Sequence, residues 1–211
     1  MTGCPKTGTT LMYHLIGSGF DGIQLLKRPD RNREEVLIKE GASFVTKCPI
    51  VEAEDRRAAD ASVRIVCMVR HPYATLISKH IHASRKAKTR GCYHNMPGHI
   101  LRGYQIASDL VLRDRAIVVR FEDLLVDPNR IQLELSVDWA MKPSHLFSEA
   151  HDHFDWEDPE ALAMHGKRKM DLSRLRPWEH AHQEDLQHIR ENFGPEMKAA
   201  AALFGYDPEP I

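Results

Sequence analysis

The feature that most constrains this chain is a short loop of glycines and small hydroxyl residues directly before an apolar segment. Residues 3–10 read Gly-Cys-Pro-Lys-Thr-Gly-Thr-Thr, and a helix is expected over residues 8–16, ended by Gly17-Ser18-Gly19. Glycines allow successive backbone N–H groups to converge on one anion at a helix N-terminus. A turn that merely connects a strand to a helix is the structural alternative. The full Pro-Lys-Thr-Gly-Thr-Thr run favours an anion-binding loop.

Short apolar, β-branched runs alternate with amphipathic stretches along the rest of the chain, which is typical of a parallel α/β sheet. We predict strands over residues 43–47, 64–70 and 116–121, helices over residues 72–82, 99–112 and 184–204, and a loop over residues 84–98. The 211 residues, 42% of them hydrophobic, are enough for one domain with its own core. We therefore predict a single three-layer α/β/α P-loop-type domain over residues 1–211, with a central, mostly parallel sheet and a helical C-terminal part from about residue 129.

The position of the lysine separates this loop from that of the nucleoside triphosphatases. Gly3 and Gly8 have the spacing of the pattern G-x-x-x-x-G-K-[ST], but Thr9 stands where the pattern requires lysine. The only lysine in the loop is Lys6. A kinase uses the patterned lysine and a magnesium ion to manage the charge of the β- and γ-phosphates. A P-loop kinase with a displaced lysine is therefore the less favoured interpretation.

Three segments resemble motifs of the sulfotransferases that use 3′-phosphoadenosine 5′-phosphosulfate (PAPS), nearer the carbohydrate and bacterial type than the cytosolic small-molecule type. Residues 4–10 look like the family's P-K-[ST]-G-T-T loop, which grips the 5′-phosphosulfate. Residues 69–78 resemble its strand ending in R-x-P and the following helix. Residues 120–128 are similar to its Y-E-D-L-x-x-D-P segment, and the tail at 204–206 also recurs there. The matches follow the family's order over nearly the whole chain.

The resemblance implies a donor site and a set of residues that hold it. The 3′-phosphate would be bound by Arg70 and by Ser78, eight residues further on, since a guanidinium and a hydroxyl suit a phosphate and two helical turns bring Ser78 over the same face. A surface ion pair for Arg70 and an ordinary helix position for Ser78 are the alternatives. The full implied set of donor-binding residues is Pro5, Lys6, Thr7, Gly8, Thr9, Thr10, Arg70 and Ser78, with Lys167 and Arg168 as counterparts of the family's basic loop before a tryptophan, here Trp178.

The chemistry implied is in-line transfer of a sulfuryl group, with adenosine 3′,5′-bisphosphate (PAP) as product. Lys6 would stabilise charge on the bridging oxygen, and Lys47, at the end of a predicted strand, would act on the transferring group. A terminal sulfuryl group is monoanionic, so that one loop lysine and backbone donors suffice and no metal is required.

The general base does not follow from the family pattern, because Thr46 and Pro49 occupy the places where the family has Glu or His. An acceptor that is acidic enough would need no strong base. Otherwise the candidates are Glu52, Glu54, His80 and His82, and Glu52 is slightly favoured because it follows the strand end.

The acceptor would be a hydroxyl or amine of a small molecule or carbohydrate that the sequence does not identify. A catalytically inactive nucleotide-binding protein of the same fold is a further alternative. Eight lysines and arginines and no acidic residue fall between Ala61 and Ser108, and such a stretch attracts a polyanionic donor. A solvated basic loop explains residues 85–90 equally well.

Composition sets limits on other functions. The net charge of −1 gives no indication of nucleic-acid binding. No apolar run approaches the roughly 20 residues of a membrane-spanning helix, and no signal peptide is visible. Four cysteines without paired spacing favour reduced thiols, so we expect a cytoplasmic protein. His151-Asp152-His153 is weak evidence for a metal site. Only Met1-Thr2 precedes the loop, which predicts either an upstream start or a shortened central strand.

Overall fold

A computed structural model describes residues 1–4, 7–26, 31–53, 63–78, 97–154, 170–181 and 183–208. The strands are β1 (Thr2–Gly3), β2 (Ile23–Leu26), β3 (Ser43–Thr46), β4 (Ile65–Val69) and β5 (Ala116–Arg120). The α-helices are α1 (Thr9–Gly19), α2 (Arg31–Lys39), α4 (Pro72–Ile77), α6 (Pro97–Leu112), α7 (Phe121–Val126), α8 (Pro128–Trp139) and α10 (Gln183–Leu203). Short 3-10 turns are η1 (Ile50–Glu52), η2 (Ala150–Asp152), η3 (Leu172–Arg174) and η4 (Pro177–His180).

All the described strand pairs are parallel. β4 lies between β1 and β5, and β2 pairs with β3. Two backbone hydrogen bonds of 3.0 Å join these sheets, from Met1 N to Thr46 O and from Cys48 N to Met1 O. The strands therefore follow the order β2, β3, β1, β4, β5, and the loop after β1 emerges at the carboxyl edge, where ligands of open α/β sheets bind.

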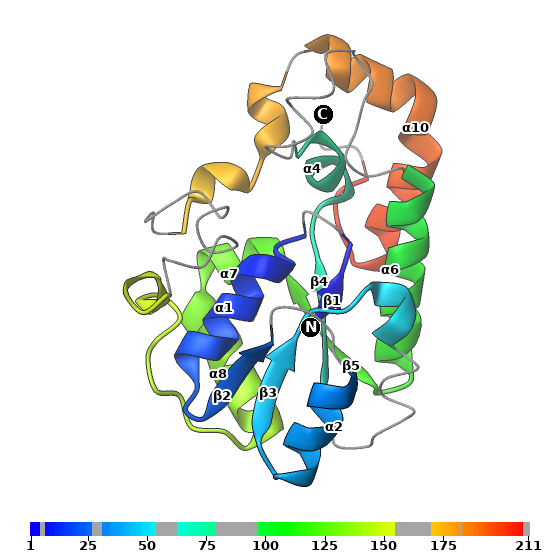
Figure 1. Ribbon diagram of the computed structural model, residues 1–211. Helices are drawn as coiled ribbons and strands as arrows, with labels where there is room; N and C mark the ends of the chain where they lie inside the picture. The colour runs from blue at the N-terminus through cyan, green and yellow to red at the C-terminus, as the bar shows by residue number, and fades with distance from the viewer. Residues whose placement is uncertain are drawn as a thin grey trace.

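The central strand β4 is buried on both faces, which makes the fold three-layered. Val66 and Met68 face a cluster with α1, α7 and α8, while Cys67 and Val69 face a cluster with α4, α6 and α10. Figure 1 shows α1, α7 and α8 on one side of the sheet and α6 and α10 on the other. The alternation follows from the period of two along a strand. The predicted α/β/α class with a parallel sheet is confirmed.

Two predicted helix ends are wrong. Helix α1 continues through Gly17 and ends at Gly19. These glycines allow close packing, because an added Cβ would lie 2.3 Å from Leu25 Cδ2 at Gly17 and 2.4 Å from Phe147 Cε1 at Gly19. Helix α4 ends at Ile77, not near residue 82, because Ser78 has extended dihedral angles (φ −60°, ψ 111°). Residues 79–82 lie outside the described part of the chain.

The edge strand β5 is less buried than β4. Only Val119 among its five residues is fully buried, since β5 pairs with β4 alone in the described sheet. Its carboxyl end leads directly into α7, so that Arg120 and Phe121 lie at the same edge as the loop after β1. None of the helices among the described residues is long and apolar enough to cross a membrane.

Candidate functional site

The loop between β1 and α1 depends on both of its glycines. Gly3 has φ +152° and Gly8 has φ +93°, conformations that side chains disfavour. An added Cβ would lie 2.6 Å from Met68 O at Gly3 and 2.4 Å from the Phe121 ring at Gly8. The loop therefore sits tightly between the end of β4 and the start of α7. Pro5 and Lys6 lie outside the described residues, and their roles stay predictions.

The N-terminus of α1 is open to an anion. Gly8 is the N-cap and has no side chain to cap the helix, and the first turn contains no acidic residue. The first intrahelical bond runs from Met12 N to Gly8 O (3.0 Å), so the N–H groups of Thr9, Thr10 and Leu11 have no acceptor within the helix. These donors at the positive end of an 11-residue helix fit a phosphate group.

The Thr7 hydroxyl makes a hydrogen bond within the loop. Its side chain is fully buried, and its hydroxyl donates to Cys4 O at 2.7 Å. The bond closes the loop on itself and holds the turn that leads into Gly8. Contact between Thr7 and a donor molecule stays a prediction, as it does for Thr9 and Thr10, whose side chains are half-buried.

Two arginines contact one aromatic ring beside this loop. The Arg70 guanidinium lies 4.6 Å from the centroid of Phe121, and that of Arg174 lies 5.5 Å from the same centroid. Arg70 Nη2 donates to Arg174 O at 2.7 Å. Because the same ring packs where a Cβ of Gly8 would be, Phe121 joins the loop to the arginine pair.

The electrostatics of the pair favour an anionic ligand. Arg70 is only 3% exposed, and burial together with the nearby Arg174 lowers the pKa of Arg70 to about 10. Burial also lowers the pKa of Arg174. Two like charges in a partly desolvated site repel each other, and an anion between or beside them would relieve this repulsion.

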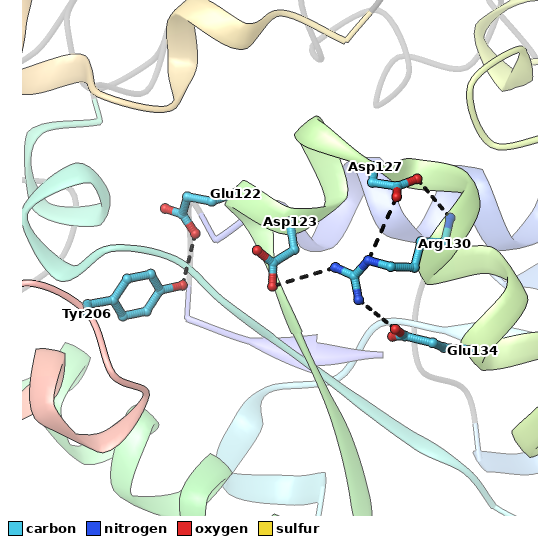
Figure 2. A network of polar contacts seen from close by, with 6 residues as sticks. All are labelled: Glu122, Asp123, Asp127, Arg130, Glu134 and Tyr206. Atoms are coloured by element: carbon cyan, nitrogen blue, oxygen red, sulfur yellow. Dashed lines mark hydrogen bonds and ion pairs between the residues drawn. The ribbon is translucent and has the colours of Figure 1, made fainter.

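Tyr104 and Glu122 hold the backbone around Arg70. The Tyr104 hydroxyl accepts from Arg70 N at 3.0 Å and donates to Arg70 O. Glu122 Oε1 accepts from His71 N at 2.9 Å. Its Oε2 accepts from the Tyr206 hydroxyl at 2.9 Å, as Figure 2 shows. These contacts join α6, α7 and the C-terminal tail to the end of β4.

Lys47 and Glu52 pack on different faces of the sheet. Lys47 follows β3, and its Nζ lies 5.3 Å from the centroid of Tyr13 on α1. Glu52 ends the turn η1, which packs against α6 through Ile50 and Gly103. Lys47 is therefore on the side of the loop helix, and its action on the transferring group stays a prediction. The role of Glu52 as a base stays a prediction, and Glu54, His80 and His82 lie outside the described residues.

Solved structures of sulfotransferases match the chain in overall fold. A sulfotransferase domain from the curacin biosynthetic pathway superposes with a TM-score of 0.67 at 15% sequence identity, covering 98% of this chain and 96% of that domain. The chain has the sulfotransferase fold. The resemblance inferred from three short motifs is thus confirmed at the level of the fold.

Two further structures share it. Mouse sulfotransferase SULT7A1 complexed with PAP matches with a TM-score of 0.58 and 11% identity, covering 98% of this chain and 87% of that chain. The sulfotransferase domain of the Synechococcus PCC 7002 olefin synthase matches with a TM-score of 0.54 and 16% identity, covering 98% and 93%. No family model and no curated protein matches the sequence.

Within this sulfotransferase fold, Ser78 lies outside the helix in which it was predicted. Helix α4 ends one residue earlier, and Ser78 N donates to Ala74 O at 3.1 Å as the C-cap. The prediction of two helical turns between Arg70 and Ser78 is therefore wrong, because Arg70 and His71 precede the helix. Contact between Ser78 and a 3′-phosphate stays a prediction.

Arg174 is the residue that sequence reasoning missed. The predicted counterparts of the basic loop, Lys167 and Arg168, lie outside the described residues. Arg174 follows them and stands four residues before Trp178, between the expected basic loop and the tryptophan. Its position before that tryptophan was the signal available in the sequence.

A concave region lined in part by His71 and Glu122 has balanced charge. This groove, of about 920 Å³, is lined by the starts of α7 and α10 and by η4. Four arginines and five carboxylates line it: Arg120, Arg130, Arg176 and Arg190 against Glu122, Asp123, Asp127, Glu179 and Asp207. It therefore lacks the one-sign potential of the arginine pair.

The motif that was weak evidence for a metal site, His151-Asp152-His153, has a contact within itself and a contact with a neighbouring histidine. His151 Nε2 lies 2.8 Å from Asp152 Oδ1, and His153 stacks on His145 with ring centroids 3.7 Å apart. In the part of the chain that the structure describes, no group of three or more His, Cys, Asp or Glu side chains could hold a metal ion.

Proposed function

We propose that this protein transfers a sulfuryl group from PAPS to a hydroxyl or amine of a small-molecule or carbohydrate acceptor. The observation that carries the proposal is the arginine pair on Phe121 beside the uncapped N-terminus of α1, in a chain with the sulfotransferase fold. PAPS supplies, when bound, an activated sulfuryl group, and transfer leaves PAP. The mouse structure of this fold is a complex with PAP, which supports the choice of donor.

Two separate anion sites bind the two charged ends of the donor. The first turn of α1, with Thr9 and Thr10, holds the 5′-phosphosulfate through N–H groups that the helix leaves without acceptors. Arg70 and Arg174 hold the 3′-phosphate. A bisphosphate nucleotide requires two such sites, and Phe121 lies between them in this chain.

The remaining groups act on the transfer itself. Lys6 stabilises the charge that develops on the bridging oxygen, and Lys47, on the same face as α1, stabilises the transferring group. Glu52 is proposed as the base that takes the proton of the acceptor. Ser78, Lys167 and Arg168 complete the 3′-phosphate site. No metal is required, because these cations and the helix N-terminus supply the positive charge.

Calorimetry with PAP and with ATP-Mg²⁺ tests the donor. We expect PAP to bind and ATP-Mg²⁺ to bind at least tenfold more weakly, since the loop lacks a lysine at position 9. A preference for ATP-Mg²⁺ would overturn the proposal in favour of a kinase. A donor-turnover assay over hydroxyl and amine acceptors then separates an enzyme from an inactive nucleotide-binding protein. In that assay Glu52→Gln should lower turnover and leave PAP affinity unchanged.

A further inference from the structure

Arg70 stands at the point where β4 loses its neighbouring strands. The last pair of the β4–β5 ladder is Val69 with Arg120. Beyond it, the N–H and C=O of Arg70 are buried without a strand to bond, and unpaired buried backbone groups are costly. The Tyr104 hydroxyl from α6 satisfies both groups at once. Tyr104 is 1% exposed, and burial raises the pKa of its hydroxyl, which keeps the donor proton in place.

Glu122 fixes the next peptide in the same way. Its carboxylate accepts from His71 N and from the Tyr206 hydroxyl, both at 2.9 Å. His71 Nε2 in turn contacts the carbonyl of Asp207 at 3.0 Å. Burial lowers the pKa of His71 to about 4, so the neutral ring donates from Nε2 to that carbonyl.

We infer that Tyr104 and Glu122 are positioning residues for Arg70: they fix the backbone of residues 70–71 so that the Arg70 guanidinium meets the 3′-phosphate of the donor. The inference rests on the proposed function. A guanidinium at the end of a long side chain recognises a phosphate only if the backbone that carries it is held to a fraction of an ångström. Here the anchors come from α6 and α7, which are distant in sequence.

The charge of Glu122 has a second effect in the same direction. Its negative charge raises the pKa of Arg70, against burial and Arg174, which lower it. Glu122 therefore both places the guanidinium and offsets part of the repulsion in the arginine pair. Tyr104 supplies placement without charge, which allows the two effects to be separated by mutation.

The test measures how much affinity the 3′-phosphate contributes. PAP and adenosine 5′-monophosphate differ only in that group, so the ratio of their dissociation constants reports its binding. We expect Tyr104→Phe to weaken PAP binding about tenfold and to leave binding of the monophosphate unchanged, because the buried hydroxyl that bonds both the N–H and the C=O of Arg70 is lost. Glu122→Gln should reduce the ratio as well. A loss that merely reflected a weaker fold would not change this ratio.

Tyr73→Phe is the matched control, since Tyr73 is buried in the same core cluster as Tyr104 and its ring centroid lies 5.9 Å from that of His71. It should keep the wild-type ratio. In an Arg70→Ala background, Tyr104→Phe should cause no further loss of PAP affinity.

Each outcome decides the matter. If Tyr104→Phe is not folded in a thermal melt, Glu122→Gln carries the test. A wild-type ratio in every folded variant of Tyr104 and Glu122 overturns the positioning role while the proposed function stands. A wild-type protein that binds PAP no better than the monophosphate overturns the proposed function, and the positioning role falls with it.

Discussion

At the scale of single residues, the arrangement around Phe121 places two positive charges close together in a partly buried site, which costs the folded protein stability. Arg70 is buried and donates to the carbonyl of Arg174, and the two guanidinium groups lie on the same ring. The ring supplies a cation–π contact to each. That contact offsets desolvation only in part, because the pKa of both arginines is lowered. Such a cost at a loop edge is typical of a binding site.

Removing either arginine should weaken PAP binding in proportion to its burial. We expect Arg70→Ala to raise the dissociation constant of PAP by about 10- to 100-fold, as for the loss of charge-assisted hydrogen bonds. Arg174→Ala should have a smaller effect of the same sign. Calorimetry measures both.

Arg176→Ala is the control for this prediction. Arg176 lies in the same segment but is 70% exposed and contacts Glu179 at 3.3 Å, and exposed pairs contribute little. Equal PAP affinity in Arg70→Ala and in Arg176→Ala would contradict the assignment of the 3′-phosphate to Arg70.

At the scale of secondary-structure elements, helix α1 is placed by its glycines. Gly8 starts it beneath Phe121, and Gly17 brings it against Leu25 of β2. The helix therefore lies close to the sheet along its length, which directs its open N-terminus to the carboxyl edge of β1 and β4. By contrast, α8 begins with a surface cap, where Asp127 Oδ1 accepts from Arg130 N at 3.1 Å and Arg130 pairs with neighbouring carboxylates (Figure 2).

Gly17→Ala should destabilise the protein although alanine is the better helix former. Its Cβ would lie 2.3 Å from Leu25 Cδ2 and 2.6 Å from Leu25 Cγ, so that Leu25 or the helix must move, at a cost of about 1–3 kcal/mol. Urea unfolding measures the change.

Gly98→Ala in the first turn of α6 is the matched substitution, since no atom of the described residues lies within 4 Å of its added Cβ. Helix propensity then acts alone, and we expect unchanged or higher stability, by up to about 1 kcal/mol. Equal effects of the two substitutions would show that close packing does not require Gly17.

At the scale of the whole molecule, the C-terminal tail closes the structure over the end of β4. Tyr206 contacts Glu122, and Asp207 O accepts from His71. The Trp178 ring of η4 lies 4.6 Å from the ring of His71. One histidine therefore stands where β4, η4 and the tail meet, and its neutral state is part of the native packing.

Acid should weaken this closure through His71. The pKa of His71 falls from 6.5 to about 4 on folding because of burial. Between these values the unfolded chain binds the proton and the native state does not. The contribution of His71 to the free energy of unfolding is therefore complete above pH 6.5 and is lost as the pH falls toward 4.

We expect the free energy of unfolding to fall by about 1–3 kcal/mol more in the wild type than in His71→Gln over that range. Glutamine keeps a donor near Asp207 O but does not titrate. Urea unfolding at pH 7, 5.5 and 4.5 gives the difference. If the free energy of unfolding fell equally with pH in the two proteins, His71 would not be the group that makes the native state sensitive to acid.

Local signals explain how much of this protein was predictable from its sequence. Glycine, proline and β-branched residues act over a few positions, and they placed the loop, the order of strands and helices, and Arg70 at a strand end. The same local nature explains the errors. Gly17 reads as a helix stop in sequence, but a glycine is needed there because Leu25 approaches from another element. The helix predicted to include Ser78 ends at Ile77.

The sequence by itself therefore determined the class of fold and the glycine-containing loop before α1, because these depend on backbone conformation and on neighbouring residues. Only the tertiary structure decided which groups surround Arg70. Arg174, Tyr104 and Glu122 come from positions 34 to 104 residues away, and their contacts arise from packing of helices on both faces of the sheet. Apart from the position of Arg174 before Trp178, no periodicity or spacing along the chain encodes such a meeting, since burial and charge act through space.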